Sequence, residues 1–432
     1  MKKDCLRHCG GTRFATRVAL FVWLFASIET IFIFHSSFAD LPTIDPLHHN
    51  GARQEHPYAK CEMTQNPFQL TFNFISLAVG SSPDSRQLSD TAETPCVGLV
   101  KKRSNQLICS TLHSLWESFP PPSDPENGAV HRAVPNIIQR PSTVKENVIV
   151  LATHLGVQKL STLVIQSRWW GGPISAAIYV KSSDEIDTFV KFVEEHEFTF
   201  RYTSFHVVME KTAMSYPHNV LRNLAMDYLD GDFFVAADVD FIPTPDCHRK
   251  LTQLFALNDR LRLKLITKTV MVLAAFERHM PNPTQEVTED LLPRNKAEVI
   301  EMVRTKKGNG FHMAGSSAGH GPTNYEKWME NKTNDFYGIE YKNIFEPYIM
   351  GYKHGIPRYW EGFRGYGYNK FSWFFEIHKA GYDFAVLRDF YVVHMNHRIP
   401  DLKKKNSMTD WNRKHWQKFK AYLSRQYKKT TS

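Results

Sequence analysis

The sequence predicts an α/β fold with a mostly parallel sheet flanked by helices. Short apolar runs rich in β-branched residues recur between residues 146 and 425, and segments with helical spacing of apolar residues separate them. The run FFVAA at 233–237 also lacks alternation of polar and apolar residues, which is typical of a central strand covered on both faces. Strands that alternate with helices in this way indicate a largely parallel sheet.

Four strands are expected in the first half of this region. They are the segments VIVLAT (148–153), ISAAIYV (174–180), SFHVVME (204–210) and DFFVAAD (232–238). Three helices are expected over residues 182–196, 216–231 and 369–380. Pro217 suits the first turn of the second helix and Gly231 suits its end, while Gly381 follows the third.

Length and composition are those of a chain with a large buried core. The protein has 432 residues, of which 42% are hydrophobic, and this excludes a wholly disordered chain. The formal net charge is +9, and the first 17 residues carry +4 of it. The mild basic bias of the remainder favours anionic ligands such as sugar nucleotides, and nucleic acid is not expected as a partner.

The N-terminal segment predicts a type II membrane anchor. We expect residues 1–17 to be a cytosolic tail and residues 18–36 a transmembrane signal anchor, because basic residues precede a long apolar run. The run Val18–Phe34 would form roughly 26 Å of helix, which suits a thin membrane of the secretory pathway. The alternative is a signal peptide that is cleaved near Ser37-Phe38-Ala39.

Residues 37–145 are expected to form a lumenal stem, and residues 426–432 a short C-terminal tail. The stem contains loop-like stretches rich in Pro, Ser and acidic residues, with apolar segments between them that are able to pack onto the main domain. Four cysteines follow the expected anchor and would face an oxidising compartment, where three disulfide pairings remain open: they are Cys61, Cys96, Cys109 and Cys247. Asn331 begins an N-glycosylation sequon.

Two aspartates follow the strand at 232–238. Ligands of open α/β sheets bind beyond the carboxyl ends of strands, and side chains two residues apart on an extended chain point the same way. Asp238 and Asp240 therefore predict a site for one divalent cation that also binds diphosphate oxygens. The alternative for this pair is a solvated loop after a strand.

Several ordered segments resemble glycosyltransferase family 49, which includes the beta-1,4-glucuronyltransferase of O-mannosyl glycan synthesis and the second catalytic domain of LARGE-type enzymes. The similarity covers roughly residues 147–425, and its blocks are RWWGGPISAAIYV, YPHNVLRNLAMDYLDGDFFVAADVDFIPTPDCHRKL, HGPTNYEKWMEN, FEPYIMGYKHGIPRYWEGFRGYGYNKFSWFFEIHKAGYDFAVL and YVVHMNH. This resemblance implies a GT-A fold, a UDP-sugar donor, and Mn²⁺ (or Mg²⁺) as the metal. It also implies a location in the Golgi membrane, or in the endoplasmic reticulum, with the catalytic domain in the lumen.

The same resemblance assigns roles to individual residues of the donor site. Asp238 and Asp240 correspond to the DxD motif, and His394 is expected as the third metal ligand, with His397 as a weaker candidate. The alternative for His394 is an ordinary core or surface histidine. Thr153 is the candidate for contact with the nucleotide, beside a segment where relatives have Asp-Arg and this chain has Gln158-Lys159.

Arg222 is expected either to pair with the donor phosphate or to form an ordinary salt bridge between helix and sheet. A glucuronate carboxylate would need a nearby cation, and Arg364 and Lys370 are the candidates. The loop around His320 and Asn324 and the side chain of Glu277 are expected to face the acceptor.

The resemblance also implies a catalytic base. Family members are inverting enzymes, so a carboxylate must take the proton of the acceptor hydroxyl. Glu361 is the expected base, although relatives often have an aspartate where this chain has Trp360. The alternatives are a base elsewhere, no base at all, or a Glu361 that is only a surface carboxylate.

The resemblance thus implies a metal-dependent inverting glycosyltransferase that moves glucuronic acid from a UDP-sugar to a glycan or glycoprotein acceptor, in O-mannosyl glycan synthesis. The alternative, suggested by Trp360 and Gln158, is a catalytically inactive relative that binds glycans or acts as an assembly partner. Either form is compatible with a homo- or hetero-oligomer.

Overall fold

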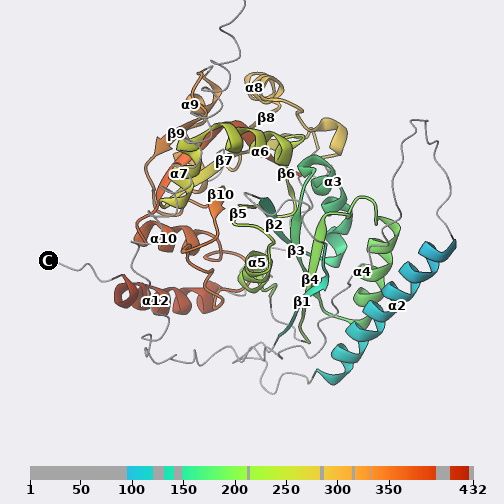
Figure 1. The fold of residues 1–432 in the computed structure, drawn as a ribbon. Helices are drawn as coiled ribbons and strands as arrows, with labels where there is room; N and C mark the ends of the chain where they lie inside the picture. The colour runs from blue at the N-terminus through green and yellow to red at the C-terminus, as the bar shows by residue number, and fades with distance from the viewer. Residues whose placement is uncertain are drawn as a thin grey trace, which may run out of the picture. The chain divides into compact units, whose positions relative to one another are not determined.

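The computed structural model describes residues 95–119, 131–140, 148–211, 215–282, 287–313, 317–330, 332–395 and 409–427 (Figure 1), all within one compact unit. The expected cytosolic tail, the anchor, Cys61, Asn331 and His397 lie outside these residues. Among the helices described, none has the length and apolar character needed to cross a membrane.

One mixed sheet forms the centre of the molecule. Its strands run in the order β1 (Arg132–Ile138), β4 (Thr203–Met209), β3 (Ile174–Val180), β2 (Ile149–Gly156), β5 (Phe233–Ala236), β10 (Tyr348–Tyr352), β7 (Thr269–Arg278), β11 (Asp383–His394) and β6 (Phe241–Pro243). Two further strands pair outside this path, β8 (Gly308–Gly310) with β7 and β9 (Phe336–Ile339) with β11.

The expected parallel sheet is present in one half of this arrangement. Strands β4, β3, β2 and β5 are parallel neighbours, and they correspond to the four strands predicted from the sequence. A helix follows each of β2, β3 and β4. Each of these helices carries the chain back along the sheet, so that the next strand runs in the same direction as the one before it. In the other half β10 is antiparallel to both β5 and β7, and β11 is parallel to β7 but antiparallel to β6. The sheet is therefore mixed, and it is parallel only around β2.

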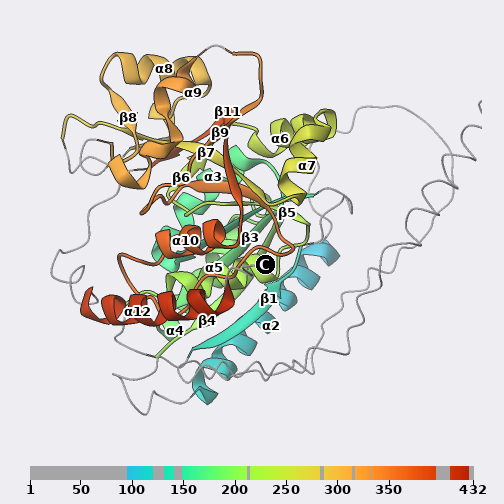
Figure 2. The ribbon, with the colours of Figure 1, turned by 90° about the vertical axis from the view of Figure 1, so that its left-hand side faces the viewer.

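Helices cover both faces of the sheet. One face packs against α2 (Pro95–Ser118), α3 (Leu160–Trp170), α4 (Ser183–Glu195), α6 (Cys247–Leu257) and α7 (Asp259–Ile266). The opposite face packs against α5 (His218–Asp227), α8 (Lys296–Arg304), α9 (Tyr325–Met329) and α10 (Phe371–Lys379). A last helix, α12 (Thr409–Gln426), lies beside α10 (Figure 2). Short 3-10 turns occur at Val157–Lys159, Glu289–Leu291, Ser317–Gly319 and Gly321–Thr323.

Alternation along the strands produces the two cores. In β2, Ile149 and Leu151 face the α2–α4 side, whereas Val150 and Ala152 face the α5 side. All the residues of β2, β3 and β4 are buried, because helices lie on both sides. The uninterrupted apolar runs of the sequence follow from this double burial.

The predicted helices occur at their expected places with small differences at the ends. Ser182 caps α4 by accepting a hydrogen bond from the backbone of Glu185. Pro217 is the N-cap of α5 and not a residue of its first turn, and α5 ends at Asp227, before Gly231. Gly381 adopts a positive φ of 83° after α10, as expected of glycine beyond a helix end.

Part of the region expected as a stem belongs to the folded unit. β1 pairs with β4 as an antiparallel edge strand, and α2 lies along α4 (Figure 1). Leu112 and Trp116 of α2 are buried in the core on that side of the sheet. The structured domain therefore begins upstream of residue 146.

A glycine pair tests the packing of the sheet. A Cβ atom added at Gly231 would lie 2.6 Å from the backbone oxygen of Val148, at the start of β2, whereas nothing lies within 4 Å of a Cβ at Gly338 in β9. We expect Gly231→Ala to lower the free energy of unfolding by roughly 1–3 kcal/mol through overpacking. Gly338→Ala is the matched control and should change it by less than about 0.5 kcal/mol. Denaturant unfolding measures both, and equal stabilities of the two variants would contradict this view of the β2–β5 junction.

Candidate active site

The candidate site lies at the C-terminal end of β5, beside the C-terminal half of β2 and the first residue of β10. The chain leaves β5 at Ala236 and turns back through Asp238 and Asp240 before β6 begins. The amide of Phe241 donates to the carbonyl of Asp238 at 3.0 Å and closes this turn. The two aspartates are therefore presented by a turn and not by an extended strand.

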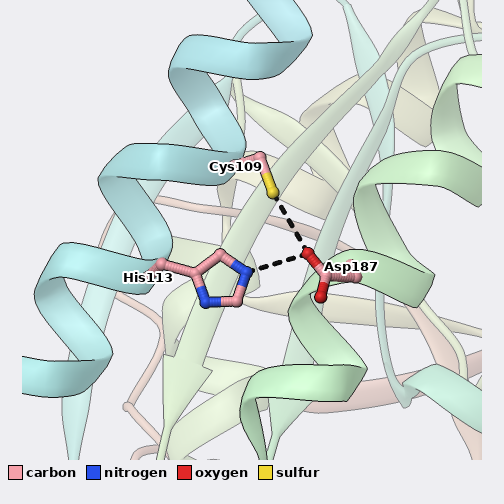
Figure 3. Close-up of side chains that lie close together, drawn as sticks. All are labelled: Cys109, His113 and Asp187. Atoms are coloured by element: carbon pink, nitrogen blue, oxygen red, sulfur yellow. Dashed lines mark hydrogen bonds and ion pairs between the residues drawn. The ribbon is translucent and has the colours of Figure 1, made fainter.

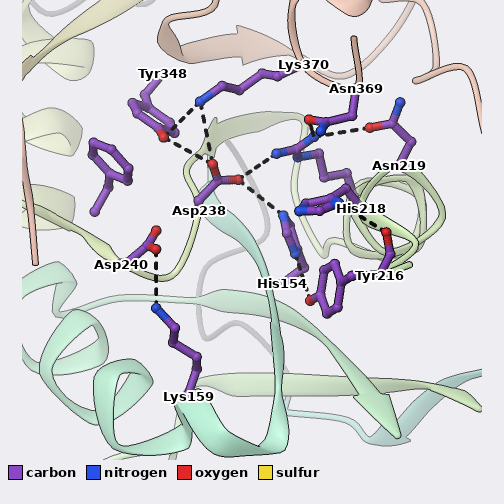
Figure 4. A network of polar contacts seen from close by, with 12 residues as sticks. His154, Lys159, Tyr216, His218, Asn219, Asp238, Asp240, Tyr348, Asn369 and Lys370 are labelled. Atoms are coloured by element: carbon purple, nitrogen blue, oxygen red, sulfur yellow. Dashed lines mark hydrogen bonds and ion pairs between the residues drawn. The ribbon is translucent and has the colours of Figure 1, made fainter. Parts of the chain in front are cut away.

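Four donors surround the carboxylate of Asp238 (Figure 4). Its Oδ1 accepts hydrogen bonds from Arg222 at 2.9 Å and from His154 Nε2 at 3.1 Å. Its Oδ2 accepts from the hydroxyl of Tyr348 at 3.0 Å and lies 3.5 Å from the ammonium of Lys370. Burial alone would raise the pKa of Asp238, but the charges of Arg222 and Lys370 and the hydrogen bond from His154 outweigh it and hold the pKa well below its usual range. Asp238 is thus a fixed anion.

His154 connects this carboxylate to the interior. Its ring is 7% exposed, and burial lowers its pKa, so it is neutral at pH 7. Because Nε2 donates to Asp238, Nδ1 accepts from the hydroxyl of Tyr216 at 3.0 Å. His218 packs edge-on against both rings, and burial holds its pKa well below the usual value.

Arg222 is anchored on both sides of its guanidinium. One nitrogen bonds to Asp238, and the other donates to the side-chain oxygens of Asn219 at 3.1 Å and Asn369 at 3.0 Å. The side chain is 8% exposed. Of the two roles considered for Arg222, the structure shows the salt bridge between helix and sheet.

Asp240 faces different partners from Asp238. Its Oδ2 lies 3.3 Å from Lys159 Nζ and 3.9 Å from His394 Nε2. A backbone hydrogen bond also joins Asp240 to the end of β11, because the amide of Met395 donates to the carbonyl of Asp240 at 2.7 Å. The turn directs the two carboxylates apart, so the same-side rule for extended strands does not apply here (Figure 4).

The residues that fit a divalent cation are therefore Asp240 and His394. A carboxylate oxygen and an imidazole nitrogen at 3.9 Å can approach one ion, and both side chains are partly exposed. Asp238 does not join them in this arrangement, because cations and hydrogen-bond donors already occupy both of its oxygens. In the part of the chain that the structure describes, these three side chains do not form a three-ligand cluster.

A small pocket opens beside Asp238 between β2, β5 and α10. Thr153, Arg222, Tyr348 and Lys370 are among the residues that line it. The hydroxyl of Thr153 is buried and has no hydrogen-bond partner among the described residues. An unpaired buried hydroxyl at the wall of a pocket indicates a place for a polar ligand group.

The two cations proposed for a donor carboxylate lie in different environments. Lys370 Nζ donates to the hydroxyl of Tyr348 at 2.8 Å and faces the pocket. Arg364 is buried, forms an ion pair with Glu210 at 2.5 Å and donates to the carbonyl of Ser215. Only Lys370 is therefore in the site.

Glu361 is held away from the pocket. Its carboxylate accepts hydrogen bonds from Asn223 at 2.7 Å and from Arg358 at 3.3 Å, and it is not among the residues that line the pocket. Trp360, at the position where relatives often have an aspartate, packs against Phe419 and Tyr422 of α12. In this chain the position serves the attachment of α12.

Helix α12 also fixes the loop that leads to Lys370. The buried side chain of Asn412 accepts from the amide of Arg364 at 3.1 Å and donates to its carbonyl at 2.8 Å. Trp411 donates to the carbonyl of Gly362 at 3.0 Å. The loop has positive φ angles at Gly365 and Gly367, which glycine adopts readily, and the contacts from α12 restrict the freedom that these glycines give to the unfolded chain.

Glu346 is a carboxylate that the sequence reasoning missed. It immediately precedes Pro347 and β10, and its amide donates to the carbonyl of Gly319 at 2.9 Å. Burial raises its pKa, although the charges of Lys370 and Arg222 act in the opposite direction. The structure gives its carboxylate no hydrogen bond to any described residue. The sequence signal for Glu346 was its place directly before a proline and an apolar strand.

His320 follows Gly319, the hydrogen-bond partner of the Glu346 amide, in the loop that was expected to face the acceptor. Its ring is 2% exposed and packs against Phe311 and Tyr348, and its Nε2 has no partner among the described residues. Asn324, by contrast, is the N-cap of α9. Glu277 is the penultimate residue of β7 and lies in register with His394, and burial raises its pKa.

Part of the chain is similar in sequence to known proteins. Residues 206–428 match the profile of the family described as "Glycosyl-transferase for dystroglycan". Relatives include mouse "Xylosyl- and glucuronyltransferase LARGE1" (30% identity over 257 residues, 58% of this chain and 31% of the relative) and Dictyostelium discoideum "Glycosyltransferase-like protein gnt14" (28% over 260 residues, 59% and 39%). The chain thus spans less than half the length of these relatives. A solved structure of residues 1–349 of Staphylococcus aureus TarS aligns with 13% identity and a TM-score of 0.31, and the alignment covers 57% of this chain and 58% of that fragment.

The charge balance around Asp238 gives a stability prediction. Asp238→Asn leaves the buried guanidinium of Arg222 without its counter-ion, so we expect a loss of roughly 3 kcal/mol in the free energy of unfolding. Asp246→Asn is the matched control, because Asp246 is exposed and pairs with Arg249 at the surface, where the loss should stay below about 1 kcal/mol. Chemical denaturation compares them, and an Asp238→Asn protein as stable as the parent would show that the network contributes nothing to the fold.

Proposed function

The chain belongs to the family described as glycosyl-transferase for dystroglycan, and on that premise we propose that it transfers glucuronic acid from a UDP-sugar to a glycan acceptor. The observation that supports this best is the strand-end corner, where a partly buried anion holds two cations beside a pocket and a carboxylate–imidazole pair. Sites of this kind suit a nucleotide diphosphate. The proposal places the reaction in the Golgi lumen, with O-mannosyl glycans as the acceptor class.

Asp240 and His394 are the residues that would hold Mn²⁺ or Mg²⁺. When bound there, the ion supplies charge neutralisation for the diphosphate that leaves. The ring of His394 is oriented by contacts with Phe241 and Phe311, with ring centroids 4.8 and 5.0 Å away. A neutral imidazole is needed for metal binding, so acidification opposes it.

Asp238 acts in this proposal as the organiser of the donor pocket. It holds Arg222 and Lys370 in place, while its own oxygens are occupied. Lys370 offers an ammonium to the uronate carboxylate or a phosphate oxygen, and the unpaired hydroxyl of Thr153 offers a hydrogen bond to the nucleotide. Binding and orientation of the donor are the roles of this group.

Glu346 is the proposed base in place of Glu361. It takes the proton of the acceptor hydroxyl while that oxygen forms a bond to C1 of the donor sugar. The bond from C1 to the β-phosphate oxygen breaks, and its electron pair leaves with UDP. Glu346 itself does not line the pocket, but it directly precedes Pro347 and Tyr348, which do. Its side chain is half-buried, its carboxylate has no hydrogen bond to a described residue, and the charges of Lys370 and Arg222 act on it.

A second candidate is a catalytically inactive relative that binds glycans. The presence of Trp360 in a structural role favours it, since the position holds no acid. The donor test below separates the two, because a binding protein would not release UDP.

Purified protein with a panel of UDP-sugars tests the reaction. We expect UDP release from UDP-glucuronate in the presence of Mn²⁺ and an acceptor glycan, with loss of activity after chelation. Asp240→Asn should lower kcat/KM by roughly 100-fold or more, because it removes a metal ligand. Asp246→Asn is the surface control. Release from a different UDP-sugar would change the donor but keep the reaction class, and no release from any donor would favour the binding protein.

Glu346→Gln tests the base. We expect kcat to fall by roughly 10²–10⁴-fold with little change in UDP binding. Activity of the parent should be lost as pH falls through the raised pKa of Glu346, because only the ionised form accepts a proton. Glu340→Gln makes the same change at an exposed position of the same loop and should keep parental kcat. Parental kcat in Glu346→Gln would exclude it as the base, while loss of UDP binding would point to a structural role.

A further inference from the structure

A second group of metal-binding side chains lies on the opposite face of the sheet from α5 and α10. Cys109 and His113 of α2 converge on Asp187 of α4 (Figure 3). His113 Nε2 lies 2.8 Å from Asp187 Oδ1, and the thiol of Cys109 donates to the same oxygen at 3.3 Å. One potential ligand atom from each residue lies within 4.8 Å of the others.

The helix spacing explains the convergence. Residues four apart lie on one face of a helix, so Cys109 and His113 point together toward α4. Leu112 between them is fully buried, which sets the face of α2 that meets the domain. Ile186 is likewise fully buried and sets the face of α4 that packs on the domain. Asp187 is the next residue of the helix and is exposed.

The distances are close to those of a tetrahedral zinc site. With metal–ligand bonds of about 2.0–2.3 Å, ligand atoms of such a site lie roughly 3.3–3.6 Å apart. The observed contacts of 2.8 and 3.3 Å need to lengthen by only a few tenths of an ångström. All three residues lie at the surface or partly exposed, so an ion can reach them and water can complete the coordination.

We propose that Cys109, His113 and Asp187 bind a zinc ion that fastens α2 to α4. A thiolate, an imidazole and a carboxylate prefer zinc to magnesium or calcium, which take oxygen ligands. The site is therefore chemically distinct from the Asp240–His394 pair. Of the two free cysteines whose side chains the structure describes, Cys109 is partly exposed and Cys247 is fully buried, so an ion in solvent can reach Cys109 and not Cys247.

Binding exchanges protons for the metal. The thiol proton of Cys109 leaves to solvent, and His113 carries its proton on Nδ1 so that the Nε2 lone pair is available. The two hydrogen bonds to Asp187 are thereby replaced by bonds to zinc. Because Cys109 and His113 lie on α2 and Asp187 lies on α4, this change fastens α2 to the rest of the domain.

Cobalt(II) is the probe that tests the proposal on the full-length chain, since it takes zinc sites and gives a thiolate-to-metal charge-transfer band. We expect one equivalent of cobalt to produce this band and zinc to remove it. Cys109→Ser should abolish the band. Asp187→Asn should weaken metal binding at least tenfold, because loss of a residue that only hydrogen-bonds to a metal ligand already lowers metal affinity roughly 10–100-fold. Asp184→Asn, an exposed position one turn earlier on α4, is the matched control and should bind as the parent does.

Hydrogen exchange supplies the second measurement. Zinc should slow exchange of the amides of α2 in the parent and in Asp184→Asn, but not in Asp187→Asn. The proposal is overturned if no thiolate band forms, if the band persists in Cys109→Ser, or if mass spectrometry finds Cys109 in a disulfide. None of these measurements depends on UDP-sugar transfer, so their failure leaves the proposed reaction untouched.

Discussion

The carboxylate of Asp238 is the interaction on which the rest of the site depends. Through Arg222, His154 and Tyr348 it connects α5, β2 and β10. Lys370, at the start of α10, joins the same group. An anion that is partly buried is tolerated only because its partners are charged or polar and well placed, and those partners in turn stay ordered because the anion is there. The corner is therefore one cooperative unit, assembled from segments that are far apart in the sequence.

The fold of the parallel half was predictable because local signals agreed there with the final structure. The apolar runs at β2 to β5 and the stripe on α4 identified strands and helix directly. The antiparallel pairings of β10 and β6 were not predictable, since they depend on contacts made across long loops. The edge strand β1 was missed for a related reason: its residues are only partly buried, and its segment lies in a region of loop-like composition.

The site was predictable by residue type more than by geometry. Asp240, His394, Arg222 and Lys370 were identified, and all four contact the same corner. The assumption that failed is the extended backbone between the two aspartates, because a turn closes there. His154 and Glu346 were missed, since a lone histidine or glutamate in a sequence carries no sign of the charges that the fold places around it.

The way in which α12 holds the loop of residues 362–367 has a practical consequence for handling the protein. Asn412 and Trp411 bind that backbone from a helix that lies within the final 24 residues, and the same loop leads into Lys370. Removal of α12 would therefore disturb donor recognition although none of the residues removed lines the pocket. Expression tags belong after the last residue, and limits for crystallisation should be drawn beyond Gln426.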